Sequence, residues 1–391
     1  MNIEIICPLY NAENYIEKLD KTIKMQKNVD ILKISYILTK SKDNTEEILK
    51  EISPDYSCVE PKDFSHSLVR EKVAMNSKAD VIVFITQDID IRNDDWLEKL
   101  VKPIFDNEAE ATFSRQLTKY ENIEKYTREK NYPEKSYINT KNDIEEKGLR
   151  TFFFSDASSA IKTEIFQRLN GYDGKNLPIS EDMYIAYKII MNGYRIKYCA
   201  DSVVYHSHKF TLKQLYKRYY DTGRFFKQEN YLDKYGTNKS GGGLAKYILK
   251  RAIQDKNIKV LFRFIPDMAA RFLGMKMGKK MEILNKQEPI RILNIVPNMR
   301  AAGIETFIMN VYRNIDRSKI QFDFIVHNKE RNFFDDEIEK LGGKIYRLSY
   351  KDDKNIFKYI KDLNNFFKKH SEYKIVHRPY AKYDAFIFIY C

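Results

Sequence analysis

The decisive stretch is residues 81–90, VIVFITQDID. Its first five residues, Val81 to Ile85, are all apolar, which predicts a central strand buried on both faces of a sheet. Similar apolar runs, each followed by a helical pattern, occur at residues 3–7 and 34–38. Strands that alternate with helices predict an α/β fold with a mainly parallel central sheet and crossover connections.

Two carboxylates follow the predicted central strand, Asp88 and Asp90. Ligands of open α/β sheets bind at the carboxyl ends of the strands, so these residues fall where a site is expected. Mg²⁺ and Mn²⁺ prefer oxygen ligands, and two alternating carboxylates on a loop can face one such cation. The sequence therefore predicts a divalent cation site, although a solvated turn or a helix cap explains an isolated triplet of this kind equally simply.

A second acidic pair, Glu181 and Asp182, opens a helix predicted at residues 180–192. A favourable interaction with the helix dipole is one explanation of the pair. The other is catalysis, because a carboxylate can take the proton from an attacking hydroxyl. We expect the pair to be catalytic, with Asp182 as the general base.

His206 and His208 follow strand segments predicted at residues 194–205. Alternate residues of an extended chain point to one face, which suits a metal ligand with a neighbouring phosphate contact; a structural role is the alternative. Arg70 and Arg115 lie near the predicted site loops, and a planar guanidinium suits a diphosphate, although surface charge explains any single arginine of so basic a chain.

The remainder of the chain contains several distinct segments. Residues 118–150 are predicted to form a loop or lid, residues 152–161 a strand, and residues 235–243 a flexible connector. Basic and apolar residues alternate at helical spacing from 246 to 285, and a new strand begins at Ile290. Three parts are therefore predicted: an α/β catalytic domain at 1–230, a basic helical extension or linker at 231–286, and a further α/β segment at 287–391.

Composition limits the class of protein. The 391 residues are 43% hydrophobic and 14% aromatic, which favours a folded protein and excludes general disorder. Four widely spaced cysteines exclude a zinc cluster or a disulfide scaffold. The net charge of +13 suits an anionic lipid, a polyanion or a phosphate-bearing substrate, or reflects lysine-rich solvated surfaces. No signal peptide or membrane span is recognised, so a cytoplasmic location is expected.

Seven segments, in chain order, resemble family-two glycosyltransferases with the GT-A fold, particularly the bacterial rhamnosyltransferase-like branch. They cover about residues 1–230 and read CPLYNAENYI, SKDNTEEI, FSHSLVREKVA, FITQDIDIRNDDWLEKL, FSRQL, SEDMYIAYKIIMNGYRIKY and VVYHSHKF. The resemblance implies an inverting transfer that uses Mn²⁺ or Mg²⁺. It also implies a dTDP- or UDP-linked sugar donor and a polysaccharide or lipid-linked glycan acceptor.

The resemblance assigns a role to each candidate residue. The resemblance implies that Pro8, Tyr10 and Asn11 line the nucleotide-base pocket, with Asp43 nearby. It implies that Asp88 and Asp90 contact the donor and the metal, and that Asp182 is the general base. It further implies that His206 and His208 contact the metal or the diphosphate, and that Arg70 and Arg115 contact the donor. One departure is that Leu38-Thr39-Lys40 replaces the acidic residue common at the end of the second strand, which leaves base selectivity open. The sequence contexts TQD and HSH suggest rhamnose.

The segment after Arg291, with NIVPNMRAAGIETFIMNVYRNID, resembles the opening of a family-four, GT-B type glycosyltransferase. The resemblance implies a partial Rossmann-like domain without the donor-binding half of that family. Independent catalysis by this segment is therefore not expected. A remnant of a fusion, a docking module and an acceptor-side platform remain alternatives for its role.

The leading hypothesis is an enzyme of capsule, O-antigen-like or cell-wall polysaccharide synthesis. It would act at the inner face of the cell membrane, with the basic stretch 209–280 as a peripheral contact to anionic lipid or a lipid-linked acceptor. The alternative is a catalytically inactive scaffold or glycan-binding protein. No nucleic-acid partner is expected, because no recognised RNA or DNA motif occurs and the basic residues are widely spread.

Overall fold

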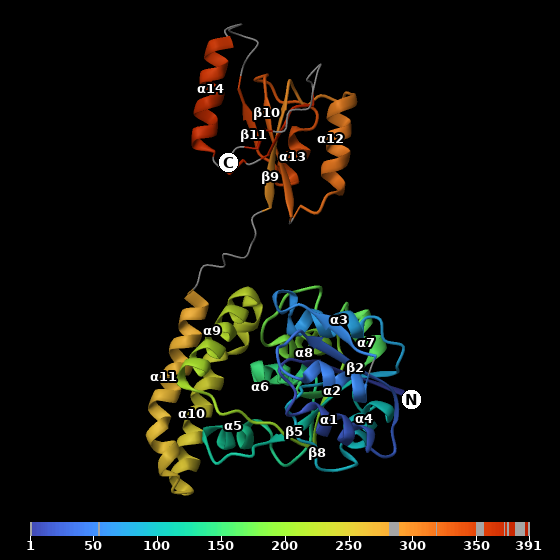
Figure 1. The fold of residues 1–391 in the computed structure, drawn as a ribbon. Coiled ribbons are helices and arrows are strands. Elements are labelled where there is room, and N and C mark those ends of the chain that lie inside the picture. Colours follow the sequence, from blue (N-terminus) through green and yellow to red (C-terminus); the bar gives the residue numbers. More distant parts are fainter. Residues whose placement is uncertain are drawn as a thin grey trace. The chain divides into compact units, whose positions relative to one another are not determined.

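The chain folds into two compact units, residues 1–281 and 282–391 (Figure 1). The predicted boundary at 287 lies outside the described residues, whereas the predicted extension belongs to the first unit as far as residue 280. The computed structural model describes residues 2–53, 55–280, 289–317, 319–348, 356–370, 372–373, 375–379 and 388–389.

An eight-stranded sheet in the order β3-β2-β1-β4-β7-β5-β8-β6 forms the middle of the first unit. Its neighbours are parallel except that β7 is antiparallel to β4 and β5, and β6 is antiparallel to β8. The predicted mixed, mainly parallel sheet is confirmed. The strands are β1 Asn2–Leu9, β2 Asp30–Thr39, β3 Ser57–Val59, β4 Val81–Ile85, β5 Ala111–Leu117, β6 Tyr137–Asn139, β7 Ser158–Lys162 and β8 Ile196–Tyr205.

Strand β4 lies inside the sheet, and all five of its residues are buried. Its side chains alternate between two apolar clusters: Ile82 and Phe84 enter one, whereas Val81, Val83 and Ile85 enter the other. This alternation is the two-residue period of a strand with a core on each face. The prediction of a central strand is therefore confirmed.

Helices cover both faces of the sheet (Figure 1). Buried residues of α1, α2 and α4 join the cluster of Ile85, and those of α3, α7 and α8 join the cluster of Phe84. The α-helices of this unit are α1 Ile16–Lys24, α2 Thr45–Ile52, α3 His66–Ala74, α4 Trp96–Phe105, α5 Ile123–Asn131, α6 Ile144–Lys147, α7 Thr163–Arg168, α8 Glu181–Met191, α9 Leu212–Gln228, α10 Thr237–Gln254 and α11 Ile258–Lys280.

The antiparallel strand β7 determines which residues meet at the functional edge of the sheet. Ser158, its first residue, pairs with Ile85, the last residue of β4. The chain just before β7 therefore lies beside the chain just after β4, and the amide of Thr86 donates to the carbonyl of Ala157 at 3.4 Å. The loops after β1 and β8 reach the same edge because these strands run parallel to their neighbours β4 and β5.

The prediction of a loop or lid at residues 118–150 is wrong. The segment contains helices α5 and α6 and strand β6. Its buried contacts come largely from tyrosines: Tyr126 is fully buried, and Tyr132 and Tyr137 pack against Tyr198 of β8. Because tyrosine carries a hydroxyl, a pattern that counts purely apolar residues overlooks a core built from its ring.

Two neighbouring predictions also need correction. The connector predicted at residues 235–243 is wrong, because α10 begins at Thr237. Later turns of this helix pack Ile248 and Ala252 against α5. This tertiary packing overrides the low helix propensity of the glycines in the first turns of α10. Of the strand predicted at residues 152–161, only the part from Ser158 is extended. The preceding turn is a 3₁₀ helix that ends at Phe152.

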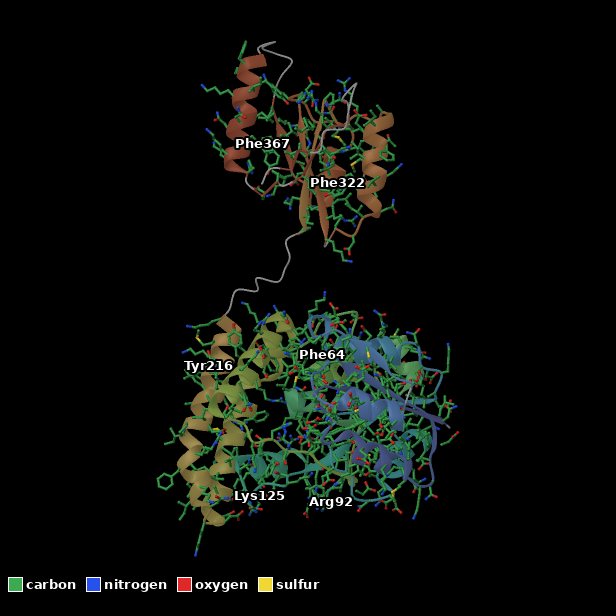
Figure 2. The ribbon with its side chains drawn as sticks, in the orientation of Figure 1. Phe64, Arg92, Lys125, Tyr216, Phe322 and Phe367 are labelled. Atoms are coloured by element: carbon green, nitrogen blue, oxygen red, sulfur yellow. The ribbon has the colours of Figure 1, made fainter. Side chains whose placement is uncertain are left out.

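Helices α9 and α11 are in contact at glycine residues. The basic stretch was predicted to be helical, and α11 confirms that prediction. A Cβ on Gly278 would lie 2.1 Å from the Tyr220 carbonyl oxygen, and one on Gly274 would lie 2.5 Å from that of Tyr216, the α9 residue labelled in Figure 2. Facing them on α9, Gly223 is equally crowded. The two backbones approach so closely that only glycine fits. Among the described residues, no helix is long and apolar enough to cross a membrane.

The second unit contains a sheet in the order β11-β10-β9-β12-β13, parallel except for the β12–β13 pair. The predicted strand at Ile290 and the helix after it are confirmed, while the assignment to a partial Rossmann-like GT-B domain stays a prediction. The elements are β9 Ile290–Val296, α12 Gly303–Asn314, β10 Ile320–Val326, α13 Asp335–Lys340, β11 Ile345–Arg347, α14 Ile356–Lys369, β12 Ile375–His377 and β13 Phe388–Ile389.

The glycine contact makes a prediction about stability. We expect Gly278→Ala to lower the free energy of unfolding by about 1–3 kcal/mol, because the added methyl group forces two backbones apart. Gly242→Ala in α10 is the matched control, since its Cβ meets nothing within 4 Å. In that open position alanine should be neutral or stabilise the helix by up to about 1 kcal/mol. Urea denaturation measures both, and equal stability of the two variants would contradict the role of the contact.

Candidate active site

A cavity of about 740 Å³ opens at the functional edge of the sheet. Its size lies in the range of small-molecule sites, about 300–1,000 Å³. Phe64, labelled in Figure 2, forms part of its wall. The other lining residues used below come from the ends of β1 and β2, the loops after β1, β4 and β8, the segment before β7, and helices α3, α8 and α9. They are Pro8, Tyr10, Thr39, Arg70, Gln87, Asp88, Ser155, Asp156, Glu181, Asp182, His206, His208, Arg218 and Thr222.

Three of these side chains form a group that could hold a metal ion. The Nε2 atom of His206 lies 3.5 Å from Oδ1 of Asp88, and Nδ1 of His208 lies 3.6 Å from Oδ2 of the same carboxylate. The three ligand atoms all lie within 4.8 Å of one another. The structure thus brings together three of the four predicted metal ligands.

The tautomer of His206 follows from its other neighbours. Its Nδ1 lies 3.0 Å from Oε1 of Gln116. That oxygen also accepts from Arg128, and the Gln116 amide nitrogen donates to Ser155 at 2.8 Å, so the amide orientation is fixed. Nδ1 must therefore carry the proton, and the lone pair of Nε2 faces Asp88. The Nε2 lone pair and the carboxylate oxygen of Asp88 are both electron-rich, so a cation between them would be bound by both. A metal-bound histidine typically donates its other ring N–H to a protein oxygen, as Nδ1 of His206 does here to Gln116.

The protonation states agree with metal binding. Burial lowers the pKa of both imidazoles, that of His208 to about 4, so both are neutral near pH 7. Burial works against ionisation of Asp88, and positive charge on the side of the two histidines lowers its pKa well below its usual range; with both imidazoles neutral, a bound cation would supply that charge. Neutral imidazoles and an ionised carboxylate are the forms that bind divalent cations. The residues therefore fit a divalent metal ion.

Asp90, the fourth predicted ligand, lies elsewhere. Its carboxylate pairs with Lys18 at 2.6 Å, Lys119 at 3.0 Å and Arg92 at 3.2 Å. Burial raises its pKa, but these three hydrogen bonds outweigh burial and lower the pKa to about 2. The prediction was that the two alternating carboxylates of this loop face one cation. The loop instead turns at residues 86–89, with the Ile89 amide donating to the Thr86 carbonyl, and the carboxylates of Asp88 and Asp90 have different partners.

The backbone of Asp90 contributes to the site indirectly. Its amide donates to the carbonyl of Tyr205, and its carbonyl accepts from the amide of Tyr205, both at 2.9 Å. This bridge holds the end of β8 against the loop after β4. His206 is the next residue, so Asp90 helps to place a candidate ligand.

The second predicted acidic pair lies on the opposite side of the cavity, where one arginine organises it. Arg70 is 1% exposed, and its Nη1 lies 2.6 Å from Oε1 of Glu181. Its Nη2 donates to the carbonyl of Asp156 at 3.4 Å. The charges of Arg70 and Glu181 thus neutralise each other. Arg70 is not free for the predicted donor contact, and Glu181 is not free for the predicted proton transfer. Both instead hold the neighbouring residues Asp156 and Asp182 in place.

Asp182 is half-buried and faces the cavity. One carboxylate oxygen accepts from the amide of Met183 at 2.7 Å. Burial, together with the negative charges of Glu181 and Asp156, raises the pKa of Asp182 well above its usual range. Such a shift makes a carboxylate a stronger base, as proton abstraction requires. The residue before the pair, Ser180, has a φ of 63°, a strained conformation that is often found at functional sites.

The predicted donor-binding residues divide into two sets. Pro8 and Tyr10 line the cavity, and Gln87 fixes the loop that carries them by bonding the Tyr10 amide and carbonyl at 2.7 and 2.8 Å. Asn11 is exposed and does not line the cavity.

Two other predicted donor contacts also lie outside the lining. Asp43 accepts from Ser41 at 2.6 Å and from Thr45 at 2.7 Å, and so holds its own loop. Arg115 pairs with Glu134 at 3.3 Å. Both side chains bind protein groups, and neither lines the cavity, although Nε of Arg115 is buried without a hydrogen-bond partner among the described residues.

Five residues of the site were not predicted: Asp156, Gln87, Gln116, Arg218 and Thr222. Asp156 is fully buried beside Arg70, and burial is the main reason that its pKa rises to about 6. Gln116 was passed over because only its position in β5 brings it to His206. Arg218 and Thr222 both line the cavity and lie four residues apart on α9. Residues at this spacing share one face of a helix, so the sequence of the predicted basic helix could have indicated that they lie together.

The chain is similar in sequence to known glycosyltransferases. The model of glycosyl transferase family 2 matches residues 4–169. The O-antigen chain rhamnosyltransferase RfbN of Salmonella typhimurium is 34% identical over 294 residues, covering 73% of this chain and 91% of RfbN. The chain belongs to glycosyltransferase family 2. The O-antigen chain rhamnosyltransferase WbaN of Salmonella anatum is 30% identical to this family 2 glycosyltransferase, covering 72% of it and 90% of WbaN.

Solved structures similar to this glycosyltransferase include two from other species. Residues 1–349 of S. aureus TarS give a TM-score of 0.45 at 12% identity, covering 73% of this chain and 93% of that one. The mannosyltransferase PcManGT of Pyrobaculum calidifontis, in complex with GDP-Man and Mn²⁺, gives 0.41 at 18% identity, covering 71% and 72%. The predicted GT-A-like α/β fold is confirmed by the mixed sheet together with the family match.

The two aspartates after β4 should behave differently towards metal. We expect Asp88→Asn to weaken Mn²⁺ binding at least about tenfold, because it removes the only anionic member of the group. Asp90→Asn, the matched control, should change Mn²⁺ affinity little, because its carboxylate binds three cationic side chains instead. Electron paramagnetic resonance of free Mn²⁺ in the presence of UDP measures both. Equal losses in the two variants would contradict this assignment.

Proposed function

We propose that this glycosyltransferase moves rhamnose from a dTDP- or UDP-linked donor to a growing cell-surface glycan. One observation carries the proposal: the half-buried carboxylate of Asp182 and the group Asp88, His206 and His208 line the same cavity. The names of RfbN and WbaN support rhamnose as the sugar and an O-antigen-like glycan as the acceptor. A capsule or another polysaccharide of the cell envelope offers the same acceptor chemistry.

The proposed reaction is a single displacement with inversion. Asp182 takes the proton of the acceptor hydroxyl as its oxygen attacks the anomeric carbon, and the bond to the donor diphosphate breaks on the opposite side. When bound at Asp88, His206 and His208, Mn²⁺ or Mg²⁺ neutralises charge on the leaving diphosphate. Arg218 faces the same cavity and supplies a further positive charge to this group.

The donor base is proposed to bind at the β1 end of the cavity. The ring of Tyr10 is 51% exposed, so its face is available for stacking. Thr39 lines the same cavity, and its buried hydroxyl has no hydrogen-bond partner among the described residues. A buried hydroxyl without a partner costs free energy, so a polar edge of a pyrimidine base would stabilise it. Thr39 thereby takes the place of the acidic residue that the family pattern has nearby.

The catalytic proposal is tested by transfer assays with a panel of nucleotide sugars that includes dTDP-rhamnose, with Mn²⁺ or with chelator. Asp182→Asn should lower kcat by about 10²–10⁴-fold, because the amide cannot accept the proton. Asp201→Asn, at an exposed position of β8, is the matched control and should leave kcat unchanged. In the native chain the rate should fall as the pH drops through the raised pKa of Asp182, since the base becomes protonated.

Two outcomes would count against the catalytic proposal. Full activity of Asp182→Asn would exclude this residue as the base. Turnover absent across the whole panel, with glycan acceptors present and donor still bound, would favour the inactive scaffold or glycan-binding protein.

We also propose a peripheral membrane contact through the outer face of α11. Its inner face packs on the rest of the unit, whereas Ile258, Phe262, Ile265 and Phe272 recur on the outer face and are 64–83% exposed. The only acidic residue of α11, Asp267, is buried, so the exposed charges of this helix are all positive. Apolar side chains flanked by lysines are typical of a helix that lies on an anionic bilayer.

Vesicle flotation tests the membrane contact. Replacing Phe262 and Ile265 by serine should lower binding to vesicles with anionic lipid at least about tenfold, since each buried apolar side chain contributes about 1.5–3 kcal/mol. Phe333→Ser, at a 73% exposed position of the second unit, is the matched control. Binding that is unchanged by the double substitution, or that is equal on neutral vesicles, would exclude this surface.

A further inference from the structure

A second cavity, of about 540 Å³, adjoins the catalytic one. His208 lines both, so the two spaces meet at a proposed metal ligand. The second cavity lies between the loop after β5, the loop after β8 and helix α11. None of the roles assigned above to the donor, the metal or the base uses its remaining residues.

Two aromatic rings line this space, Tyr120 from the first loop and Phe210 from the second. Both are half-buried, and a cation lies over each ring: Lys209 at 4.3 Å from the centroid of Tyr120 and Arg218 at 5.7 Å from that of Phe210, so only the uncovered part of each ring is open to a ligand. Asn122 and Thr211 also line the space, and their side chains cap α5 and α9 by accepting from the amides of Glu124 at 3.0 Å and Gln214 at 3.2 Å. Aromatic faces suit a pyranose ring, which presents C–H groups on its own faces.

Most charged residues of the cavity have a partner, which is a charged side chain or a backbone carbonyl, and Lys209 lies over the ring of Tyr120. Arg271 binds Asp267 at 2.7 Å and Glu124 at 3.3 Å, and all three are at least nine-tenths buried. Lys119 is paired with Asp90, and Arg263 donates to the carbonyl of Phe210. A network that already satisfies its charges offers a poor site for a diphosphate but a rigid, polar floor for an uncharged ligand.

The two loops are joined to each other and to the candidate metal group. The amide of Lys119 donates to the Ser207 hydroxyl at 3.1 Å, and the Asn122 amide group donates to the carbonyl of His208 at 3.4 Å. The ring of His208 lies 4.9 Å from that of Phe210. A ligand stacked on Phe210 would therefore lie next to the reacting centre.

We propose that this second cavity binds the acceptor glycan, as a subsite for the sugar next to the one that carries the reacting hydroxyl. The inference rests on the proposed function and adds the location of the acceptor to it. Tyr120 and Phe210 act as the stacking surfaces, and the acceptor reaches Asp182 past His208. Acceptor selectivity is thus set by the loops after β5 and β8, apart from the residues that bind the donor.

Saturation-transfer NMR with the full-length chain tests the subsite. The probes are methyl glycosides of rhamnose, galactose, glucose and mannose, and the 1,3- and 1,4-linked disaccharides of these sugars, with UDP and dTDP plus Mn²⁺ titrated separately. Tyr120→Leu and Phe210→Leu should each weaken binding of the glycosides that the native chain binds about fivefold, from loss of one stacking contact. Tyr120→Phe should retain binding, and Phe333→Leu is the surface control. Thermal melting confirms that each variant is folded.

The outcomes separate this subsite from the proposed function. Glycoside binding that is lost only in the two leucine variants, with nucleotide binding intact, supports the subsite. The subsite is excluded if no probe binds the native chain, if both leucine variants bind glycosides normally, or if they lose nucleotide binding as well. Glycoside binding at these residues in a native chain that binds neither nucleotide would contradict the donor proposal and leave the subsite standing.

Discussion

The buried ion pair between Arg70 and Glu181 is the constraint on which the catalytic side of the cavity depends. Three carboxylates, Asp156, Glu181 and Asp182, lie near one guanidinium that is almost inaccessible to water. Removing one partner of such a pair costs about 3–5 kcal/mol, because the other charge remains buried. Burial is the main reason that the pKa values of Asp156 and Asp182 rise, and the negative charge of their acidic neighbours adds to it because one guanidinium cannot compensate three carboxylates. The excess negative charge thus resides at the edge of the cavity, where a base is useful.

On the other side of the cavity, charge and hydrogen bonding have the opposite effect. Asp88 stays ionised between two imidazoles whose burial keeps them neutral, and Gln116 fixes the direction in which His206 presents its lone pair. A strong base and a cation-binding group therefore coexist in one space of about 740 Å³. The mixed sheet makes this arrangement accessible, because β7 runs against its neighbours and brings Asp156 to the same edge as Asp88.

Sequence patterns predicted this fold wherever burial is strong and local. The runs at β1, β2 and β4 contain consecutive apolar residues, so their strands and order of succession could be recognised. The segment 118–150 could not, because its core is built from tyrosine rings that meet only in three dimensions. The candidate site follows the same division: Asp88, Asp182, His206 and His208 directly follow strands or begin a helix, and they meet as expected. Asp90 was predicted to bind the metal but pairs with Lys18 instead, because a turn redirects its side chain. Gln116 was not predicted because its role is to bind His206, which lies 90 residues away in the sequence.

The glycine contact between α9 and α11 has a mechanical consequence. Arg218 and Thr222, which line the catalytic cavity, are within a turn and a half of Gly223, where the two backbones touch without intervening side chains. Flexible side chains at a helix interface can absorb small displacements, whereas two backbones in direct contact leave no such slack. A displacement of α11 would therefore move α9 with it, and with α9 the part of the cavity lining that Arg218 and Thr222 provide.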